Sequence, residues 1–445
     1  MPSTPALDGA PPPPQENPAF HLIAHGNHDS VQAVAFNAYG DRCATGSVDG
    51  KIRVFNRHKD GIWRLCDHWS AHGSEILELQ WLPPTVYPNL LASLGIEGHF
   101  KLWTEDNSAP PGRRFSATGK AAYETRSPKS PYRSFSIKHN EDTRHTYFAL
   151  LAADGKLSVF ESEEPETLAD YTAIDEFQAL PKPSRGEETC FKVRFDPNPE
   201  PCYTALRAGV PIDALGLVVS GLMTARVYRT RETITGSFGA ATRAREFYQA
   251  AEITGHKGLV RDVAWAPGNF RGYDMIATAC QDGHVRVFRL DTPFSPNDGK
   301  SWSVSDVLGK GKHEESRSSS TSTRTATATN SSRTAQEQAQ AHAHHSGIRA
   351  EIDKSGTQGE RKYLGQPGQV GHTARELCKL ENMTRHGDHR SPVWRVGFDD
   401  DGQILGSVGD EGKLMCYRQK PDGTWAKSSE LAPMKAKLVV PQNVQ

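Results

Sequence analysis

A short phrase that recurs six times along the 445-residue chain constrains its fold more than any other feature. Each copy has an apolar strand start, a run of small residues, an acidic or glycine turn, and a strand that ends in an aromatic residue. The copies end in IRVF, FKLW, LSVF, ARVY, VRVF and LMCY. A phrase repeated at intervals near about 40 to 45 residues is typical of a β-propeller. The sequence therefore predicts an all-β chain with six blades.

The apolar positions of each copy indicate which side chains form the core. Three apolar residues open a copy, and the last two alternate at the strand period. These sets are Val31, Val34, Phe36; Ile76, Leu79, Trp81; Tyr132, Phe135, Ile137; Cys190, Val193, Phe195; Val260, Val263, Trp265; and Val393, Val396, Phe398. The turn that follows is an acidic residue and a glycine in five copies, which suits a tight hairpin with positive φ. The fourth copy, with Met223 and Thr224, departs from this pattern.

Composition sets the domain boundaries. Residues 1–18 are rich in proline, and residues 309–375 contain SRSSSTSTRTATATNSSRTAQEQAQAHAHH, so neither segment can bury enough apolar surface to offset the entropy of ordering. We expect both to be disordered, with the second as an insert between blades five and six. The propeller is predicted over 19–431 with a tail at 432–445. Its blades are expected near 28–70, 72–123, 132–178, 190–250, 256–308 and 389–431.

One shorter segment, Asp106–Pro131, is rich in proline, serine and arginine and is expected to be a mobile loop. It contains Ser127 and Ser130, each followed by proline, which are candidate phosphorylation sites because added charge there would disturb no core. The segment is expected to join blades two and three.

Charge and cysteine content exclude several classes of protein. The 52 basic and 53 acidic side chains nearly cancel, so no global field draws in nucleic acid or an anionic membrane. The start of the chain lacks the pattern of a secretory signal, and no stretch approaches the ~18 apolar residues of a spanning helix. Seven scattered cysteines show neither disulfide nor zinc spacing. We expect a protein of a reducing compartment, with no direct binding to nucleic acid and no direct membrane insertion.

Candidate chemistry is weak throughout. His342, His344 and His345 lie in a low-complexity tract without a carboxylate or cysteine shell, so a flexible linker is favoured over a metal site. The aspartates at 399–401 suit a solvated turn better than a calcium loop. The GKGK at 309–312 lacks the strand and the Ser or Thr of a phosphate loop. We therefore expect no metal, no cofactor and no catalysis.

The repeat resembles the WD-repeat family, whose signature joins a loop histidine, a strand serine or threonine, a turn acid and a strand tryptophan by hydrogen bonds. Four blades supply parts of this set: His28, Thr45 and Asp49; His72, Ser93, Glu97 and Trp103; His256, Thr278 and Asp282; and His389, Ser407 and Glu411. Blade two approaches a full set, and no blade ends in Trp-Asp. The chain is thus similar to a divergent member.

Within that family, the amino-acid sequence of the blades is similar to that of the WD-repeat scaffold nucleoporins of the Y-shaped outer-ring complex. The phrases HDSVQAVAFNAYGDRCATGSVDGKIRVF, YFALLAADGKLSVFE and HRSPVWRVGFDDDGQILGSVGDEGKLMCY carry this resemblance, which spans about Phe20–Leu431 without the insert. It implies an open, non-catalytic propeller that is completed in trans by strands of an α-helical scaffold nucleoporin, with other subunits of that complex as further partners.

The same resemblance implies a location at the nuclear pore complex of the nuclear envelope, in support of mRNA and protein transport. It also implies a second residence at the periphery of the vacuolar membrane, in a complex that regulates target-of-rapamycin signalling.

The residues by themselves leave two ways to complete blade six. FHLIA at 20–24 can close the ring in the ordinary manner, or TWAKSSEL at 424–431 can be the outer strand of blade six and leave FHLIA over. The resemblance favours the open form. In that case a partner adds strands beside the gap, and we predict contacts at Phe20, His21, Leu22 and Ile23 together with the exposed edge of blade six.

Two further functions stay open as alternatives. One is the paralogous propeller of the COPII coat in vesicle transport from the endoplasmic reticulum to the Golgi. The other is a peptide-reading WD-repeat adaptor, which requires an acidic or aromatic cluster at the mouth of the central channel.

Overall fold

The computed structural model describes residues 29–431 together with residues 23 and 26, apart from several gaps. The long gaps are 308–368 and 382–390. The short gaps are 85, 88, 111, 116–118, 165–167, 169, 236–241, 269–270, 296–299 and 304–306. The segments predicted to be a disordered start and a tail, and most of the predicted insert, therefore lie outside the described residues.

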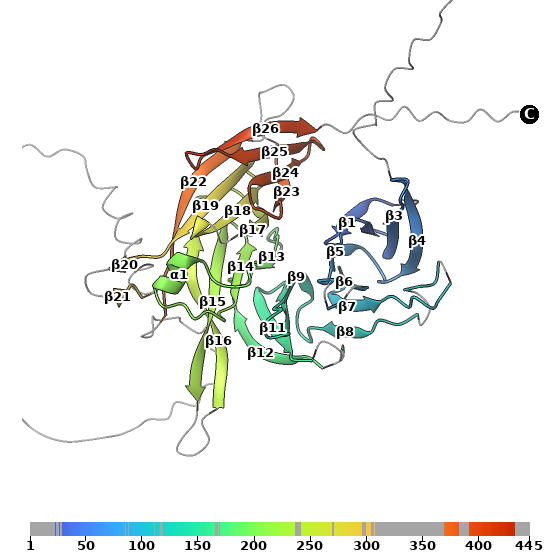
Figure 1. Cartoon of the computed structure of the whole chain (residues 1–445), viewed down its shortest axis with the longest axis horizontal. Helices are drawn as coiled ribbons and strands as arrows, with labels where there is room; N and C mark the ends of the chain where they lie inside the picture. The colour runs from blue at the N-terminus through green and yellow to red at the C-terminus, as the bar shows by residue number, and fades with distance from the viewer. Residues whose placement is uncertain are drawn as a thin grey trace, which may run out of the picture. The chain divides into compact units, whose positions relative to one another are not determined.

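The described residues form six four-stranded antiparallel sheets, which confirm the prediction of six β-blades (Figure 1). Blade one consists of β1 (Val31–Phe36), β2 (Arg42–Ser47), β3 (Lys51–Arg57) and β4 (Trp63–Ser70). Blade two consists of β5 (Ile76–Trp81), β6 (Leu90–Gly95), β7 (His99–Thr104) and β8 (Tyr123–Arg126). Blade three consists of β9 (Tyr132–His139), β10 (Thr146–Ala152), β11 (Lys156–Ser162) and β12 (Thr172–Gln178).

The second half of the chain repeats this plan. Blade four consists of β13 (Lys192–Phe195), β14 (Gly216–Gly221), β15 (Thr224–Thr235) and β16 (Thr242–Ile253). Blade five consists of β17 (Val260–Trp265), β18 (Asp274–Cys280), β19 (His284–Asp291) and β22 (Thr373–Glu381). Blade six consists of β23 (Val393–Phe398), β24 (Ile404–Gly409), β25 (Leu414–Gln419) and β26 (Trp425–Leu431).

The fourth strand of blade five corrects the predicted position of the insert. Blade five does not end at 308, because β22 (Thr373–Glu381) pairs with β19. The insert therefore interrupts blade five between its third and fourth strands, and does not separate blades five and six. Composition placed the boundary at residue 375, but TARELCKLE carries Leu377, Cys378 and Leu380, which pack against the core of blades five and six, and it pairs along all of β19.

The segment Asp106–Pro131 also differs from its prediction as a mobile loop. It supplies β8, the fourth strand of blade two, and Phe115, which is 2% exposed. The Phe115 ring stacks on Trp69 at 5.0 Å, and its backbone N–H donates to Asp67. Aromatic burial thus anchors a segment whose overall composition is polar.

The remaining regular elements lie in two loops. The helix α1 (Tyr203–Arg207) follows β13, and a two-stranded sheet of β20 (Phe294–Ser295) and β21 (Lys300–Ser301) follows β19. Figure 1 shows that β15 and β16 extend well beyond the other strands of blade four. Their twelve-residue strands pair from Ala225↔Ile253 to Thr235↔Thr242.

The chain divides into two compact units, Met1–Ala153 with Glu161–Tyr171, and Asp154–Phe160 with Thr172–Gln445. In the first unit, one core joins blades one and two. In the second unit, one core joins blades four and five and another joins blades five and six. In each case small and β-branched side chains of one blade pack against the first strand of the next. Small side chains let the two sheets approach closely enough to fill the space between them.

A β-bulge occurs at the same place in the inner strands of blades one, two, five and six and gives a common reference for comparing their residues. The register shifts after the first residue of the inner strand at Val31, Ile76, Val260 and Val393. A bulge bends a strand and increases its local twist, so these inner strands begin with the same local backbone geometry. Residues at the same distance from the bulge can therefore be compared between blades.

Candidate functional site

The signature residues of blade two form a continuous buried hydrogen-bond network. The Trp103 indole N–H donates to Ser93 Oγ at 2.9 Å, and Ser93 Oγ lies 2.8 Å from His72 Nε2. His72 Nδ1 lies 2.6 Å from Glu97 Oε1. The Glu97 carboxylate can only accept, so His72 donates to it from Nδ1, and the unprotonated Nε2 accepts from the Ser93 hydroxyl. Burial lowers the pKa of His72, against the opposing effect of Glu97.

Blade five has a shorter version of this network. His256 Nε2 lies 2.8 Å from Thr278 Oγ1, and Phe288 replaces the tryptophan donor. Burial lowers the pKa of His256 to about 4. Asp282 accepts from the backbone N–H of Lys257 at 3.0 Å and from both terminal nitrogens of Arg286, at 3.1 and 2.6 Å.

The Asp282 carboxylate is strongly stabilised in its charged form. Burial disfavours the charge, but the hydrogen bonds from Arg286 and from the Lys257 N–H outweigh that effect and hold the pKa of Asp282 well below its usual range. The networks of blades two and five tie a hairpin turn to its sheet. Their polar atoms are turned inward, so their role is structural.

Blades one and six show the signature only in part. Thr45 and Ser407 are buried, Asp49 accepts from the Lys51 N–H at 3.0 Å, and Glu411 lies 3.7 Å from Lys413 Nζ. The predicted partners His28 and His389 lie outside the described residues.

The inner strand of blade one differs sharply from its counterparts in exposure. Val34 and Phe36 are 53% and 56% exposed, whereas Val263 and Trp265 at the same repeat positions are 1% and 4% exposed. The counterparts in the other blades are buried or half-buried: Leu79, Trp81, Phe135, Ile137, Val193, Phe195, Val396 and Phe398. In blades two, five and six, the preceding blade covers this face. Among the described residues of its unit, blade one has no preceding blade.

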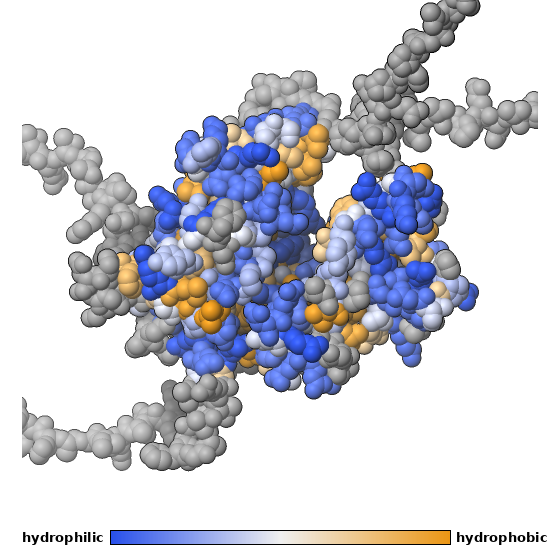
Figure 2. All heavy atoms as spheres, in the orientation of Figure 1, coloured by the Kyte–Doolittle hydropathy of each residue, from blue (hydrophilic) through white to orange (hydrophobic). Residues whose placement is uncertain are grey.

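Blade six leaves its opposite face uncovered. In blade one, Ala33 and Ile52 are 6% and 0% exposed because blade two covers them. The residues of blade six at those repeat positions are Arg395, which is exposed, and Leu414, which is 37% exposed. Figure 2 shows hydrophobic residues among the hydrophilic ones over both blades, as it does over other parts of the visible face.

Consecutive blades are also joined by hydrogen bonds from a side chain of one blade to the inner strand of the next. Glu78 of blade two accepts from the backbone N–H of Phe135 at 2.9 Å, and Asp262 of blade five accepts from that of Val396 at 3.2 Å. Gln80 bonds both the N–H and the carbonyl of Ile137, at 3.2 and 3.1 Å. Val34 stands at the repeat position of Phe135 and Val396. No carboxylate is found on its N–H in the part of the chain that the structure describes.

The partner-binding residues that we predicted can be placed only in part. Phe20, His21 and Leu22 lie outside the described residues, and Ile23 is half-buried without regular structure. Sequence reasoning grouped Val34 and Phe36 with their buried counterparts. The apolar pattern is the same in every copy, so the signal that could have separated them is their place in the first copy.

Other chemistry is not evident in the described part of the chain. Its helices include none long and apolar enough to cross a membrane. Within the same residues, no group of three or more His, Cys, Asp or Glu side chains could hold a metal ion. All seven cysteines are free thiols.

Comparisons with known proteins agree with this architecture. Residues 17–56 and 247–289, which include the inner strands of blades one and five, match the WD domain, G-beta repeat family. The chain is 50% identical to nucleoporin SEH1 of Chaetomium thermophilum, in an alignment that covers 97% of this chain and 98% of that protein. It is 28% identical to nucleoporin SEH1 of Saccharomyces cerevisiae over 88% of this chain and 93% of that protein. The human nucleoporin SEH1 is 22% identical over 91% and 85%, respectively.

The alignment with the Chaetomium protein spans almost the whole chain and therefore includes the blades described above. The chain belongs to the SEH1 nucleoporin family, WD-repeat propellers that are non-catalytic structural components of the nuclear pore complex.

Proposed function

We propose that this chain is an open propeller that is completed in trans by β-strands of an α-helical scaffold nucleoporin. The observation that supports this most is the exposure of Val34 and Phe36, at positions that a neighbouring blade covers elsewhere. The segment 425–431 forms β26, so blade six has four strands of its own. In the described residues, no strand from the start of the chain completes it.

Physical chemistry explains why strands are the expected partner. An uncovered sheet face offers apolar area, and burying a Val or Phe side chain contributes roughly 1.5–3 kcal/mol. The inner edge of β1 also offers backbone N–H groups such as that of Val34. Glu78 and Asp262 satisfy the equivalent groups of the following blades. A partner strand with a carboxylate at the matching position would do the same for blade one.

The cellular setting of the proposal rests on family membership. We propose that the partner and this chain belong to the Y-shaped outer-ring complex and support transport of mRNA and protein through the pore. A second residence at the vacuolar membrane, in a complex that regulates target-of-rapamycin signalling, is part of the same proposal. The COPII coat and a peptide-reading role are outcomes that partner identification would reveal.

Purification of the tagged chain from its own cells tests the proposal directly. A stoichiometric α-helical nucleoporin should co-purify, and Val34→Asp with Phe36→Asp should reduce its recovery strongly. Ile212→Asp is the matched control, because Ile212 is 60% exposed in a loop of blade four and should leave recovery unchanged. Full recovery with the double variant, or a coat subunit as the stable partner, would overturn the proposal.

A further inference from the structure

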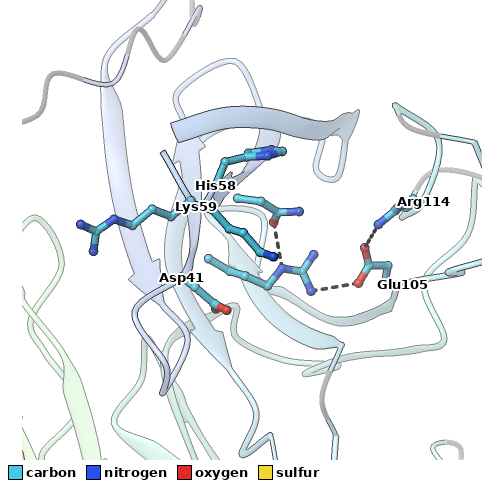
Figure 3. A pocket seen from close by; sticks show the side chains of 8 residues that line it. Asp41, His58, Lys59, Glu105 and Arg114 are labelled. Atoms are coloured by element: carbon cyan, nitrogen blue, oxygen red, sulfur yellow. Dashed lines mark hydrogen bonds and ion pairs between the residues drawn. The ribbon is translucent and has the colours of Figure 1, made fainter. Parts of the chain in front are cut away.

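A polar pocket of about 440 Å³ lies at one end of blades one and two, within the first unit (Figure 3). It is formed where the β1–β2 turn, the β3–β4 turn and the end of β7 meet. Figure 3 shows His58 and Lys59 entering from the β3–β4 turn, and Glu105 and Arg114 lying across from them. The pocket belongs neither to the WD signature networks nor to the uncovered faces.

The floor of the pocket is an arginine held in a fixed orientation. Arg42 donates from Nε to Asn56 Oδ1 at 3.1 Å and from Nη1 to Glu105 Oε2 at 2.9 Å. Its guanidinium lies over the rings of Trp81 at 4.8 Å and Phe115 at 5.6 Å. The second terminal nitrogen, Nη2, is buried and has no hydrogen-bond partner. A rigid guanidinium with an unused donor is preorganised to bind an oxyanion.

The charges around Arg42 leave the pocket positive. Four permanently cationic side chains and two carboxylates line it. One carboxylate, Glu105, is 3% exposed and is shared by Arg42 and Arg114, which lies 3.5 Å away. The other, Asp41, accepts from Asn37 Nδ2 at 2.7 Å. The exposed Lys59 forms no ion pair with either acid among the described residues.

We propose that this pocket binds a phosphate monoester, with Lys59 and Arg42 Nη2 as its donors. A phosphate monoester carries about −1.5 to −2 charges near neutral pH, which matches the surplus of two positive charges, and its three oxygens accept from several directions. A carboxylate has less charge and fewer acceptor sites. The ligand is either a phosphorylated side chain of a peptide segment or a free phosphate compound, and the two sources share this chemistry.

Calorimetric titration of the full-length chain in phosphate-free buffer tests the site. The probes are inorganic phosphate, the peptide Ala-Ala-phosphoserine-Ala-Ala, its unphosphorylated form, and the same peptide with glutamate in place of phosphoserine. We expect saturable binding of a phosphate-bearing probe that weakens with added salt. Phosphopeptide that binds more tightly than inorganic phosphate identifies a peptide source, and the reverse order identifies a free compound.

Exposed side chains allow a test that does not endanger folding. Lys59→Ala should weaken binding of the phosphate-bearing probe about tenfold, as expected for a lost charged hydrogen bond. Lys182→Ala is the matched control, because Lys182 is an exposed lysine of the second unit and its loss should change nothing. Absence of saturable binding, equal binding of the glutamate peptide, or an unchanged affinity in Lys59→Ala would overturn the proposal.

Discussion

Blades one and five have the same pattern of apolar residues on their inner strands, but these residues differ in how far they are buried. In blade five, Val263 and Trp265 pack against Val218 and Val227 of blade four and are almost fully buried. In blade one, the equivalent Val34 and Phe36 are more than half exposed. The same repeat position is therefore a core position where a preceding blade covers it, and an exposed apolar position where none does.

The largest effect is expected from truncating the two aromatic residues of this comparison. Trp265→Ala should lower the free energy of unfolding by about 3–5 kcal/mol, because it opens a cavity in a packed core. Phe36→Ala should change the stability of the isolated chain by less than about 1 kcal/mol, since solvent already reaches the ring. Denaturant unfolding of both variants measures the contrast. Equal losses would show that blade one is covered within the chain.

The turn acids extend the comparison at a smaller scale. Asp282→Ala in blade five should cost about 3 kcal/mol, because it leaves the buried Arg286 guanidinium without its bidentate partner. Asp49→Ala in blade one should cost less, because Asp49 lies 3.8 Å from Arg53 and is not bidentate. Equal losses in thermal unfolding would contradict the assigned difference.

The same aspartate gives a pH dependence. The pKa of Asp282 is lower in the folded state than in the unfolded state, so its contribution is fully present above the unfolded value near ~3.9. This contribution is lost as the pH falls from about 4 toward the folded pKa. The difference in melting temperature between the parent protein and Asp282→Ala should therefore be smaller at pH 3 than at pH 7. A gap that stays constant would show that Asp282 does not titrate in this way.

The smallest effect is expected at the hairpin turn of blade four. Leu222 has a φ of 55°, a conformation that is unfavourable for a leucine, whereas Gly50 of blade one has a φ of 75°. Leu222→Gly should raise the free energy of unfolding by about 0.5 kcal/mol, because the relief of strain is partly offset by the entropy of glycine. The opposite kind of change in blade one, Gly50→Ala, should lower the free energy of unfolding, since its Cβ would clash with the carbonyl oxygen of His72. A loss of stability in Leu222→Gly would show that the leucine side chain contributes more than the turn geometry.

Periodicity was sufficient for the blades because it is a local property. The spacing of Val260, Val263 and Trp265 specifies a strand with one apolar face, and the Asp-Gly pairs specify the turns between strands. Composition was a weaker guide. It marked Asp106–Pro131 as a loop although Phe115 anchors it, and it ended blade five before β22, whose pairing with β19 spans the insert.

Local sequence patterns were enough to predict the repeat, the six blades, the signature residues of blades two and five, and the likeness to scaffold nucleoporins, because each depends on residues that lie close together in the chain. Only the folded structure shows which copies of the repeat are covered, where the insert interrupts a sheet, and that Arg42, Lys59 and Glu105 share a pocket. The physical reason is that burial depends on the neighbour that a face meets. Val34 and Val263 have the same side chain and the same place in the repeat, and the presence or absence of a covering blade makes one of them buried and the other exposed.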